Sequence, residues 1–223
     1  MKNRTVKDLL YEQVARIGKA IGSPKRLELL EVLAQGEKTV EALAADLDID
    51  MRLASAHLKA LREARLVVAR RAGKYMIYRL SGDDVAGLWV TLREVAEAHL
   101  IELRAALERI TADPQQLVSL GRAELLEQAR RGEIVVIDVR PQDEYQAAHL
   151  PCARSMPLAE IEQRLDELPR DREIVAYCRG PFCLLSEQAL QLLARRGFRV
   201  RKLSDGVSEW RAAGLPIERA AAA

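Results

Sequence analysis

Two kinds of hydrophobic pattern divide this sequence into two parts. As far as residue 110, apolar residues recur at steps of three and four, the period of amphipathic helices, apart from two short β-rich runs. Further on, continuous apolar runs such as those at 134–137 and 174–177 alternate with segments expected to be helical, at 158–168 and 184–196. Such runs are typical of strands buried on both faces, and their alternation with helices favours a parallel sheet. The patterns predict three segments: a mostly α-helical domain at 1–110, a linker at 111–122 that contains Pro114, and an α/β domain at 123–219.

The composition is that of an ordinary globular protein, with 49% hydrophobic and 30% charged residues. No stretch approaches the roughly 18–20 apolar residues of a membrane helix, and the first residues lack the apolar core of a secretion signal. We therefore expect a cytoplasmic protein that does not bind membranes. The three cysteines, Cys152, Cys178 and Cys183, all lie in the second part and lack CxxC spacing. This favours redox or nucleophilic chemistry over a disulfide framework or a structural zinc site.

In the first part, the order of the expected elements is that of a winged helix-turn-helix. Helices are expected at 6–21, from an N-cap at Ser23 followed by Pro24, from an N-cap at Thr39, and at 51–65. β-rich runs at 67–71 and 75–80, joined by Ala-Gly-Lys, predict a hairpin, and 83–110 is helical again.

The helix expected at 51–65 has two chemically different faces. Met51, Ala54, Leu58 and Leu61 share one face and are expected in the core, while polar and basic residues share the other. Between residues 51 and 82 there are eight basic residues and one acidic residue, which is the charge balance of a phosphate-binding surface. We therefore expect this helix to enter the major groove of a double-stranded DNA operator, with the hairpin as a wing on the backbone or minor groove.

The candidate DNA-contacting residues lie on the polar face of this helix and on the hairpin: Arg52, Ser55, His57, Lys59, Arg62, Arg70, Arg71 and Lys74. His57 has two interpretations, a phosphate contact or local packing.

Residues 17–80 resemble the ArsR/SmtB family of winged-helix repressors, through the strings SPKRLELLEVL, TVEALAADL, SAHLKALREARLV and GKYMIYRL. The resemblance implies a homodimer that pairs through its terminal helices. The apolar stripe at 83–110 fits that role, and it fits an intramolecular core equally well.

This sequence departs from the sensing members of that family. Many relatives bind metals through cysteines in the helix corresponding to 39–47, or through acidic and histidine clusters on the last helix. In this sequence the segment at 39–47 has no cysteine. The last helix retains only His99 and Glu102 of the acidic and histidine clusters. Relatives that sense redox place two cysteines in this domain, which has none here. We therefore expect no metal site, and we expect any sulfur or redox signal to enter through the second domain.

Residues 134–217 resemble the rhodanese superfamily, through IDVRPQDEYQAAHLPCARSMPL, IVAYCRGPFCLLSEQA and LSDGVSEWRAAGLPI. The resemblance places Cys178 at the catalytic cysteine and implies that Asp138 and Arg140 organise the loop after the first strand. It gives Glu144 and His149 mainly structural hydrogen bonds.

The position of Cys178 also suits a reactive thiol. This residue ends an expected strand and opens a loop before a helix, where backbone N–H groups and the helix dipole lower the pKa of a thiol. Arg179 adds a positive charge. Sulfane sulfur would be carried covalently on Cys178, so no cofactor is expected. The rest of the expected active-site loop follows this cysteine: Arg179, Gly180, Pro181, Phe182 and Cys183.

Cys183 stands where many active rhodaneses carry a cation. It is either a resolving thiol, able to attack a persulfide or sulfenate on Cys178, or a small buried residue. Phosphatases of the same fold carry an arginine six residues after the cysteine, and here that residue is Leu184, which argues against phosphate chemistry. Cys152 replaces a glycine common in the family, and the sequence assigns it no role.

Three functions are compatible with these features. The first is a homodimeric DNA-binding regulator whose rhodanese-like domain senses sulfane sulfur or redox signals on Cys178, with small sulfur species or low-molecular-weight thiols as partners. The second is a sulfurtransferase with an accessory DNA-binding domain. The third makes the rhodanese-like domain a catalytically silent ligand-binding module, for example for an arsenical oxyanion.

Overall fold

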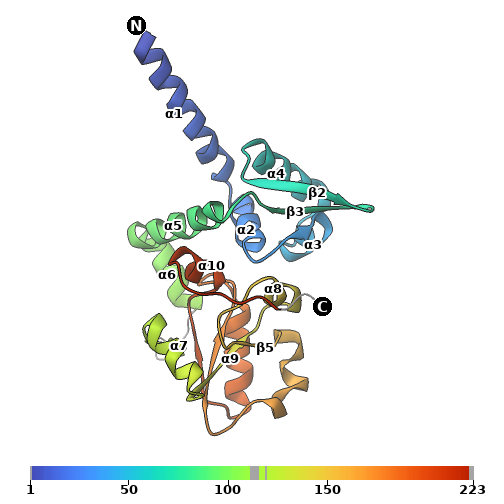
Figure 1. Ribbon diagram of the computed structural model, residues 1–223, viewed down its shortest axis with the longest axis vertical. Helices are drawn as coiled ribbons and strands as arrows, with labels where there is room; N and C mark the ends of the chain where they lie inside the picture. The colour runs from blue at the N-terminus through green and yellow to red at the C-terminus, as the bar shows by residue number, and fades with distance from the viewer. Residues whose placement is uncertain (1, 111–115, 119, 221–223) are drawn as a thin grey trace. The chain divides into compact units, whose positions relative to one another are not determined.

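The computed structural model describes residues 2–110, 116–118 and 120–220 (Figure 1). The chain forms two compact units, Met1–Trp89 and Val90–Ala223. Much of the linker expected at 111–122, including Pro114, lies outside the described residues. Among the helices that are described, none is both long enough and apolar enough to cross a lipid bilayer.

The first unit is a helical domain with a small antiparallel sheet. Its elements follow in chain order: α1 Lys2–Ile21, α2 Pro24–Leu33, β1 Lys38–Thr39, α3 Val40–Asp46, α4 Met51–Glu63, β2 Val67–Ala72, β3 Tyr75–Leu80 and the start of α5 Asp83–His99. The strand order is β1-β3-β2, and β2 and β3 form the expected hairpin. Leu29, Leu43, Leu58 and Leu61 are fully buried in a core shared by α2, α3 and α4. The expected winged helix-turn-helix is confirmed.

Two helix starts in this unit differ in how they are capped. The Thr39 hydroxyl accepts a hydrogen bond from the Ala42 amide at 3.2 Å, which confirms Thr39 as the N-cap of α3. Ser23 is confirmed as the N-cap residue of α2, but its side chain makes no capping hydrogen bond. Pro24, with φ already suited to a helix, begins α2 without that bond.

The helical stretch at 83–110 is two helices, not one. α5 ends at His99 and α6 spans Ile101–Ile110. The interruption at Leu100 is a single residue without glycine or proline, so the apolar period continues across it and the sequence pattern does not reveal it. α5 begins in the first unit, and its residues from Val90 onward belong to the second.

The second unit contains a parallel four-stranded sheet of order β5-β4-β6-β7. Its elements after α6 follow in chain order: α7 Arg122–Arg130, β4 Ile134–Asp138, α8 Gln142–Ala147, β5 Arg154–Ser155, the 3-10 segments η2 Leu158–Gln163 and η3 Leu165–Glu167, β6 Glu173–Tyr177, α9 Leu185–Arg195, β7 Val200–Lys202 and α10 Val207–Ala212. The expected α/β parallel-sheet fold is confirmed.

Each face of this sheet has its own core. Ile137 and Ala176 pack with residues of α9 on one face. Val136, Tyr177 and Trp210 pack together on the other, with residues of α7. Alternate residues of β4 and β6 therefore point to opposite, equally apolar sides, which explains why their sequences are continuous apolar runs.

The helix expected at 158–168 is wrong, because this stretch forms η2 and η3, with Arg164 between them. Leu158 and Ile161 are three residues apart, as are Leu165 and Leu168. A step of three is the period of a 3-10 helix as well as one step of an α-helical pattern, so the spacing does not distinguish the two.

Candidate nucleic-acid interface and cysteine loop

Helix α4 presents the polar face that the sequence predicts. Ala54, Leu58 and Leu61 are fully buried, while the polar residues Arg52, Ser55, Lys59 and Arg62 are exposed and His57 is half-buried. The expectation that Met51 lies in the core is wrong, because its side chain is 50% exposed. Asp50 is the N-cap, so Met51 is the first helical residue and lies at the end of the helix, beyond the core contacts of Ala54.

The basic residues of this surface differ in how strongly they are already held. In the hairpin, the Arg70 guanidinium forms a two-pronged ion pair with Glu37, which raises the pKa of Arg70. Arg71 Nε donates to the Gly73 carbonyl at 3.0 Å, across the turn of the wing. In α4, Lys59 Nζ lies 3.9 Å from Glu63.

Within the described part of the chain, Arg52 and Arg62 have no ion-pair partner. The side chains of the two arginines of α4 are therefore less constrained by protein contacts than that of Arg70. Lys74 Nζ, near the wing tip, lies 5.1 Å from the centre of the Tyr75 ring.

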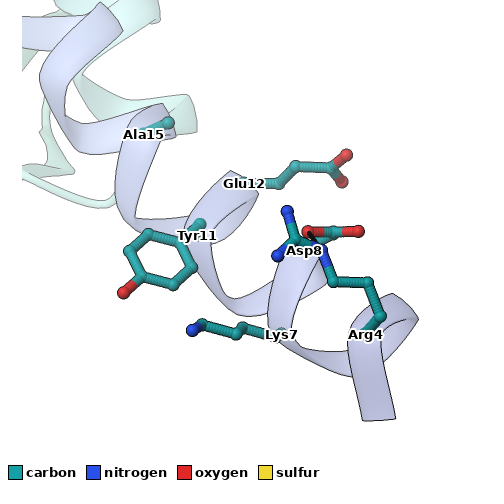
Figure 2. Close-up of a pocket in the computed structure, with 6 residues that line it drawn as sticks. All are labelled: Arg4, Lys7, Asp8, Tyr11, Glu12 and Ala15. Carbon is teal, nitrogen blue, oxygen red and sulfur yellow. Dashed lines mark ion pairs between the residues drawn. The ribbon is translucent and has the colours of Figure 1, made fainter. Parts of the chain in front are cut away.

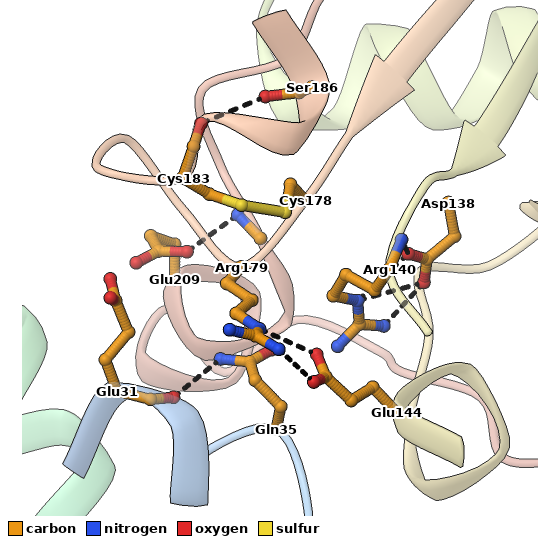
Figure 3. The surroundings of a disulfide bond; sticks show 11 residues. Glu31, Gln35, Asp138, Arg140, Glu144, Cys178, Arg179, Cys183, Ser186 and Glu209 are labelled. Atoms are coloured by element: carbon orange, nitrogen blue, oxygen red, sulfur yellow. Dashed lines mark hydrogen bonds and ion pairs between the residues drawn. A yellow bond between two sulfur atoms is a disulfide. The ribbon is translucent and has the colours of Figure 1, made fainter. Parts of the chain in front are cut away.

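The cysteine loop joins the end of β6 to α9. Cys178 follows β6 directly and is buried, and Leu184 is the N-cap of α9. Cys178 and Cys183 form a disulfide with their Cα atoms 6.2 Å apart (Figure 3). The Cys183 amide donates to the Gly180 carbonyl at 3.1 Å, and the Ser186 hydroxyl donates to the Cys183 carbonyl at 3.4 Å. The two cysteines, five positions apart in the sequence, are thus joined covalently across the loop.

Arg179 is held by a carboxylate next to the loop. Its Nε donates to Glu144 Oε2 at 3.0 Å, its NH2 donates to Glu144 Oε1, and Glu144 is 1% exposed. Figure 3 shows the guanidinium directed toward Glu144 and away from the disulfide. The positive charge expected beside the Cys178 thiol is therefore largely compensated by Glu144.

Asp138 and Arg140 form a fully buried network at the ends of β4 and β6. Arg140 Nε donates to Asp138 Oδ1 at 2.9 Å, and Arg140 NH2 donates to the Ala148 carbonyl at 2.7 Å. The Tyr177 hydroxyl donates to Asp138 Oδ2 at 2.6 Å and accepts from the Leu150 amide at 3.0 Å. Burial and the Asp138 charge raise the pKa of the Tyr177 hydroxyl well above 10. The network links the strand that precedes Cys178 to the loop after β4.

His149 is also tied into the structure by hydrogen bonds. Its amide donates to the Glu218 carbonyl at 2.8 Å, and its Nδ1 lies 2.9 Å from the Tyr145 carbonyl oxygen. Its ring stacks on Tyr145 with the ring centres 3.9 Å apart.

Three residues beside the cysteine loop were not singled out from the sequence: Arg93, Gly206 and Glu209. A Cβ atom on Gly206 would lie 2.5 Å from the Cys178 carbonyl oxygen, so only glycine fits there. Glu209 Oε2 accepts from the Gly206 amide at 2.6 Å, and Glu209 Oε1 accepts from Arg93 NH1 at 2.7 Å. Gly206 and Glu209 lie in the closing rhodanese-like string and could have been found there. Arg93 is 116 positions from Glu209, and no local pattern connects them.

Cys152 is exposed and has a φ of 64°, a left-handed conformation that glycine adopts without strain. This explains why a glycine suits the position.

An open groove of about 560 Å³ runs along α1 and is lined by that helix alone (Figure 2). Arg4 and Asp8 form an ion pair in it at 3.1 Å. The groove is lined by Arg4, Lys7, Asp8, Tyr11, Glu12 and Ala15. No cluster of three or more histidine, cysteine or acidic side chains that could hold a metal occurs among the described residues of the chain.

The fold and the cysteine loop define a class of protein in which one chain contains a winged helix-turn-helix unit and a rhodanese-type α/β unit. Residues 23–68 match the family described as bacterial regulatory protein, arsR family, and residues 122–213 match the rhodanese-like domain. The HTH-type transcriptional regulator Rv0324 of Mycobacterium tuberculosis is 44% identical over 215 residues, which cover 96% of this chain and 94% of the relative. The chain belongs to the ArsR-type transcriptional regulators that carry a C-terminal rhodanese-like domain.

Two further relatives each match one part of the chain. A sulfurtransferase of Allochromatium vinosum is 35% identical over 86 residues, 38% of this chain and 78% of the relative. The homodimeric winged helix-turn-helix DNA-binding domain of Mb0332 from Mycobacterium bovis, a possible ArsR-family regulator, is 46% identical, covers 43% of this chain and 89% of that domain, and has a TM-score of 0.41.

Proposed function

We propose that this regulator is a homodimer whose affinity for its DNA operator depends on the sulfur state of Cys178 and Cys183. The observation that carries the proposal is the placement of the cysteines. The first 151 residues contain none, while the strand-to-helix loop of the rhodanese-like unit holds two that form a disulfide. The reactive element and the DNA-binding element are therefore in different units of one chain.

The chemistry needs only a sulfane-sulfur donor. The Cys178 thiolate attacks an inorganic polysulfide and takes one sulfur atom, and the polysulfide leaves one sulfur shorter. The Cys183 thiolate then attacks Cys178 Sγ, the disulfide forms, and hydrosulfide leaves with the electron pair of the broken S–S bond. Two thiols are oxidised and one sulfane sulfur is reduced to hydrosulfide, so no other oxidant is required. Low-molecular-weight thiols reverse the switch by reducing the disulfide.

Exposed apolar side chains support the homodimer. On α1, Val6, Leu10 and Val14 are 57–70% exposed, and α6 has no buried residue. A single chain thus leaves apolar helical faces in water, which is typical of surfaces that pair. Pairing through these terminal helices would place two α4 helices on one operator.

A sulfurtransferase is the second candidate function, favoured by the likeness to the A. vinosum sulfurtransferase and by the location of Cys178. Two features count against efficient turnover. Cys183 occupies the position at which a cation would bind an anionic donor, and Arg179 is held by Glu144.

Intact-mass analysis of the full-length reduced protein after polysulfide treatment, read beside an operator titration, tests the proposal. The wild type should lose about 2 Da as Cys178 and Cys183 join, and Cys183→Ser should gain about 32 Da as the persulfide accumulates on Cys178. Operator affinity should change only in the protein that forms the disulfide. An unmodified Cys178 would instead favour the silent ligand-binding module. Continuous turnover of thiosulfate with unchanged DNA binding would favour the enzyme.

A further inference from the structure

The structure points to Arg93 and Glu209 as a coupling pair that carries the state of the cysteine loop to helix α5. The inference rests on the proposed function and names the part of the chain that would transmit the signal. α5 is the element concerned because it starts at Asp83 in the first unit and continues from Val90 into the second. A displacement of its second half is passed on to the first unit through a continuous helical backbone.

Arg93 is a charged side chain buried on this helix, 4% exposed. Its NH1 donates to Glu209 Oε1 at 2.7 Å, and its Nε lies 3.1 Å from Glu97 Oε1, one turn further along α5. Glu209, on α10, is 3% exposed. Because a charge buried this deeply is stable only beside its partner, the positions of α5 and α10 are tied together by this contact.

The same pair lies against the backbone between the two cysteines. A Cβ atom on Gly180 would lie 3.2 Å from Glu209 Oε1 and 3.3 Å from Arg93 NH1, and Gly180 has a φ of 145°. The Arg93 guanidinium carbon is 5.8 Å from the centre of the Phe182 ring. Glu209 also accepts from the amide of Gly206, which in turn packs on the Cys178 carbonyl. Each charge of the pair therefore faces the segment that the disulfide closes.

Opening the disulfide releases this segment. With the bond in place, Gly180 and Phe182 are confined between two cysteines whose Cα atoms are 6.2 Å apart. Without it, the loop backbone moves relative to the ion pair. Since Arg93 and Glu209 must stay paired, they move together and α5 moves with them.

The test compares full-length Arg93→Gln and Glu209→Gln with the matched control Arg122→Gln. Glu209→Gln keeps an amide oxygen that can accept from Gly206. Arg122 Nε pairs with Asp205 at 2.5 Å, next to Gly206, but it belongs to α7 and not to α5. Two quantities are measured for the reduced and the disulfide form of each protein: hydrogen exchange of the α5 amides at 90–99, and the dissociation constant for the operator.

In the wild type and in Arg122→Gln, reduction should change the exchange rates of α5 and shift operator affinity. In Arg93→Gln and Glu209→Gln, mass analysis should show that the disulfide still forms. The ratio of the operator dissociation constants of the reduced and disulfide forms should fall to about one. Arg93→Lys, which keeps the charge, should restore part of the shift. A wild-type α5 whose exchange is indifferent to reduction overturns the coupling, as does a full shift in Arg93→Gln. Changed α5 exchange with unchanged DNA affinity counts against the proposed function alone.

Discussion

At the scale of single residues, a few residues have a backbone conformation or a degree of burial that is unfavourable for their type. Substitutions of these residues should have the clearest effects on stability. Cys152 has a backbone conformation suited to glycine, the cationic Arg140 is fully buried, and Lys202 is 2% exposed. Each departure has a defined physical cost and therefore a measurable consequence.

Cys152→Gly should stabilise the second unit by about 0.5–1 kcal/mol. Relief of a left-handed conformation is worth about 1–2 kcal/mol, and the extra chain entropy of glycine offsets about 0.5–1 kcal/mol of it. Because the thiol is exposed, no packing is lost. Urea unfolding measures the difference, with Cys152→Ala as the control that removes the thiol and keeps the strain. Equal stability of the two variants would contradict the explanation.

Arg140→Met should destabilise the second unit by about 3–5 kcal/mol, because Asp138 would remain buried without its cation. Arg131→Ala is the matched control, since Arg131 pairs with Glu133 on the surface with both side chains more than half exposed. An exposed pair contributes about 0–1 kcal/mol. Urea unfolding measures the free energy of unfolding of both variants. Comparable losses of stability in the two would show that burial does not determine the cost of removing the arginine.

Lys202→Met should be more stable than the wild type at neutral pH, and the advantage should shrink as the pH rises. Desolvation lowers the pKa of Lys202 below 10.5, so folding is penalised while the amine is charged. The penalty is full below the lowered pKa and disappears as the pH rises above about 10.5, where the lysine of the unfolded chain also becomes neutral. Unfolding free energies between pH 7 and the alkaline limit of the fold check this. A difference that is constant over the whole range would refute it.

At the scale of elements, the sequence predicts a helix or strand well where a cap or a long apolar period marks it. Thr39, the hairpin and the buried strands β4 and β6 were predictable for that reason. The 3-10 segments after Leu158 and the break at Leu100 were not, because an apolar step of three suits two kinds of helix and a one-residue interruption leaves the period intact. Met51 was misplaced because a position in the first turn satisfies the periodicity without reaching the core.

Asp50→Ala should destabilise the first unit by about 0.5–2 kcal/mol, the usual value for a lost N-cap. Asp50 Oδ1 accepts from the Arg52 amide at 2.8 Å and from the Leu53 amide at 3.0 Å, and so fixes the start of α4. Ser23→Ala removes a side chain from an N-cap position that has no such bond and should change stability by less than about 0.5 kcal/mol. Thermal unfolding compares them, and an equal effect would remove the capping explanation.

At the scale of the whole molecule, both fold types and the class of protein were predictable because the sequence carries several motifs of each family in a fixed order. The location of Cys178 in a strand-to-helix loop was predictable from the apolar strand before it and the helical segment after it. The pairing of Arg70 with Glu37, of Arg179 with Glu144 and of Arg93 with Glu209 was not predictable, because each joins elements that are distant in sequence. These pairings decide which cations are free and how the cysteine loop is held, so they bear directly on function.

The central claim is that the sulfur state of the cysteine loop controls DNA binding. The most direct measurement is the operator dissociation constant of full-length wild type and Cys178→Ser, each reduced and each after polysulfide. The wild type should shift by about fivefold or more, the usual lower range of allosteric coupling, and Cys178→Ser should give one constant in both states. The same constant in all four samples would contradict the claim.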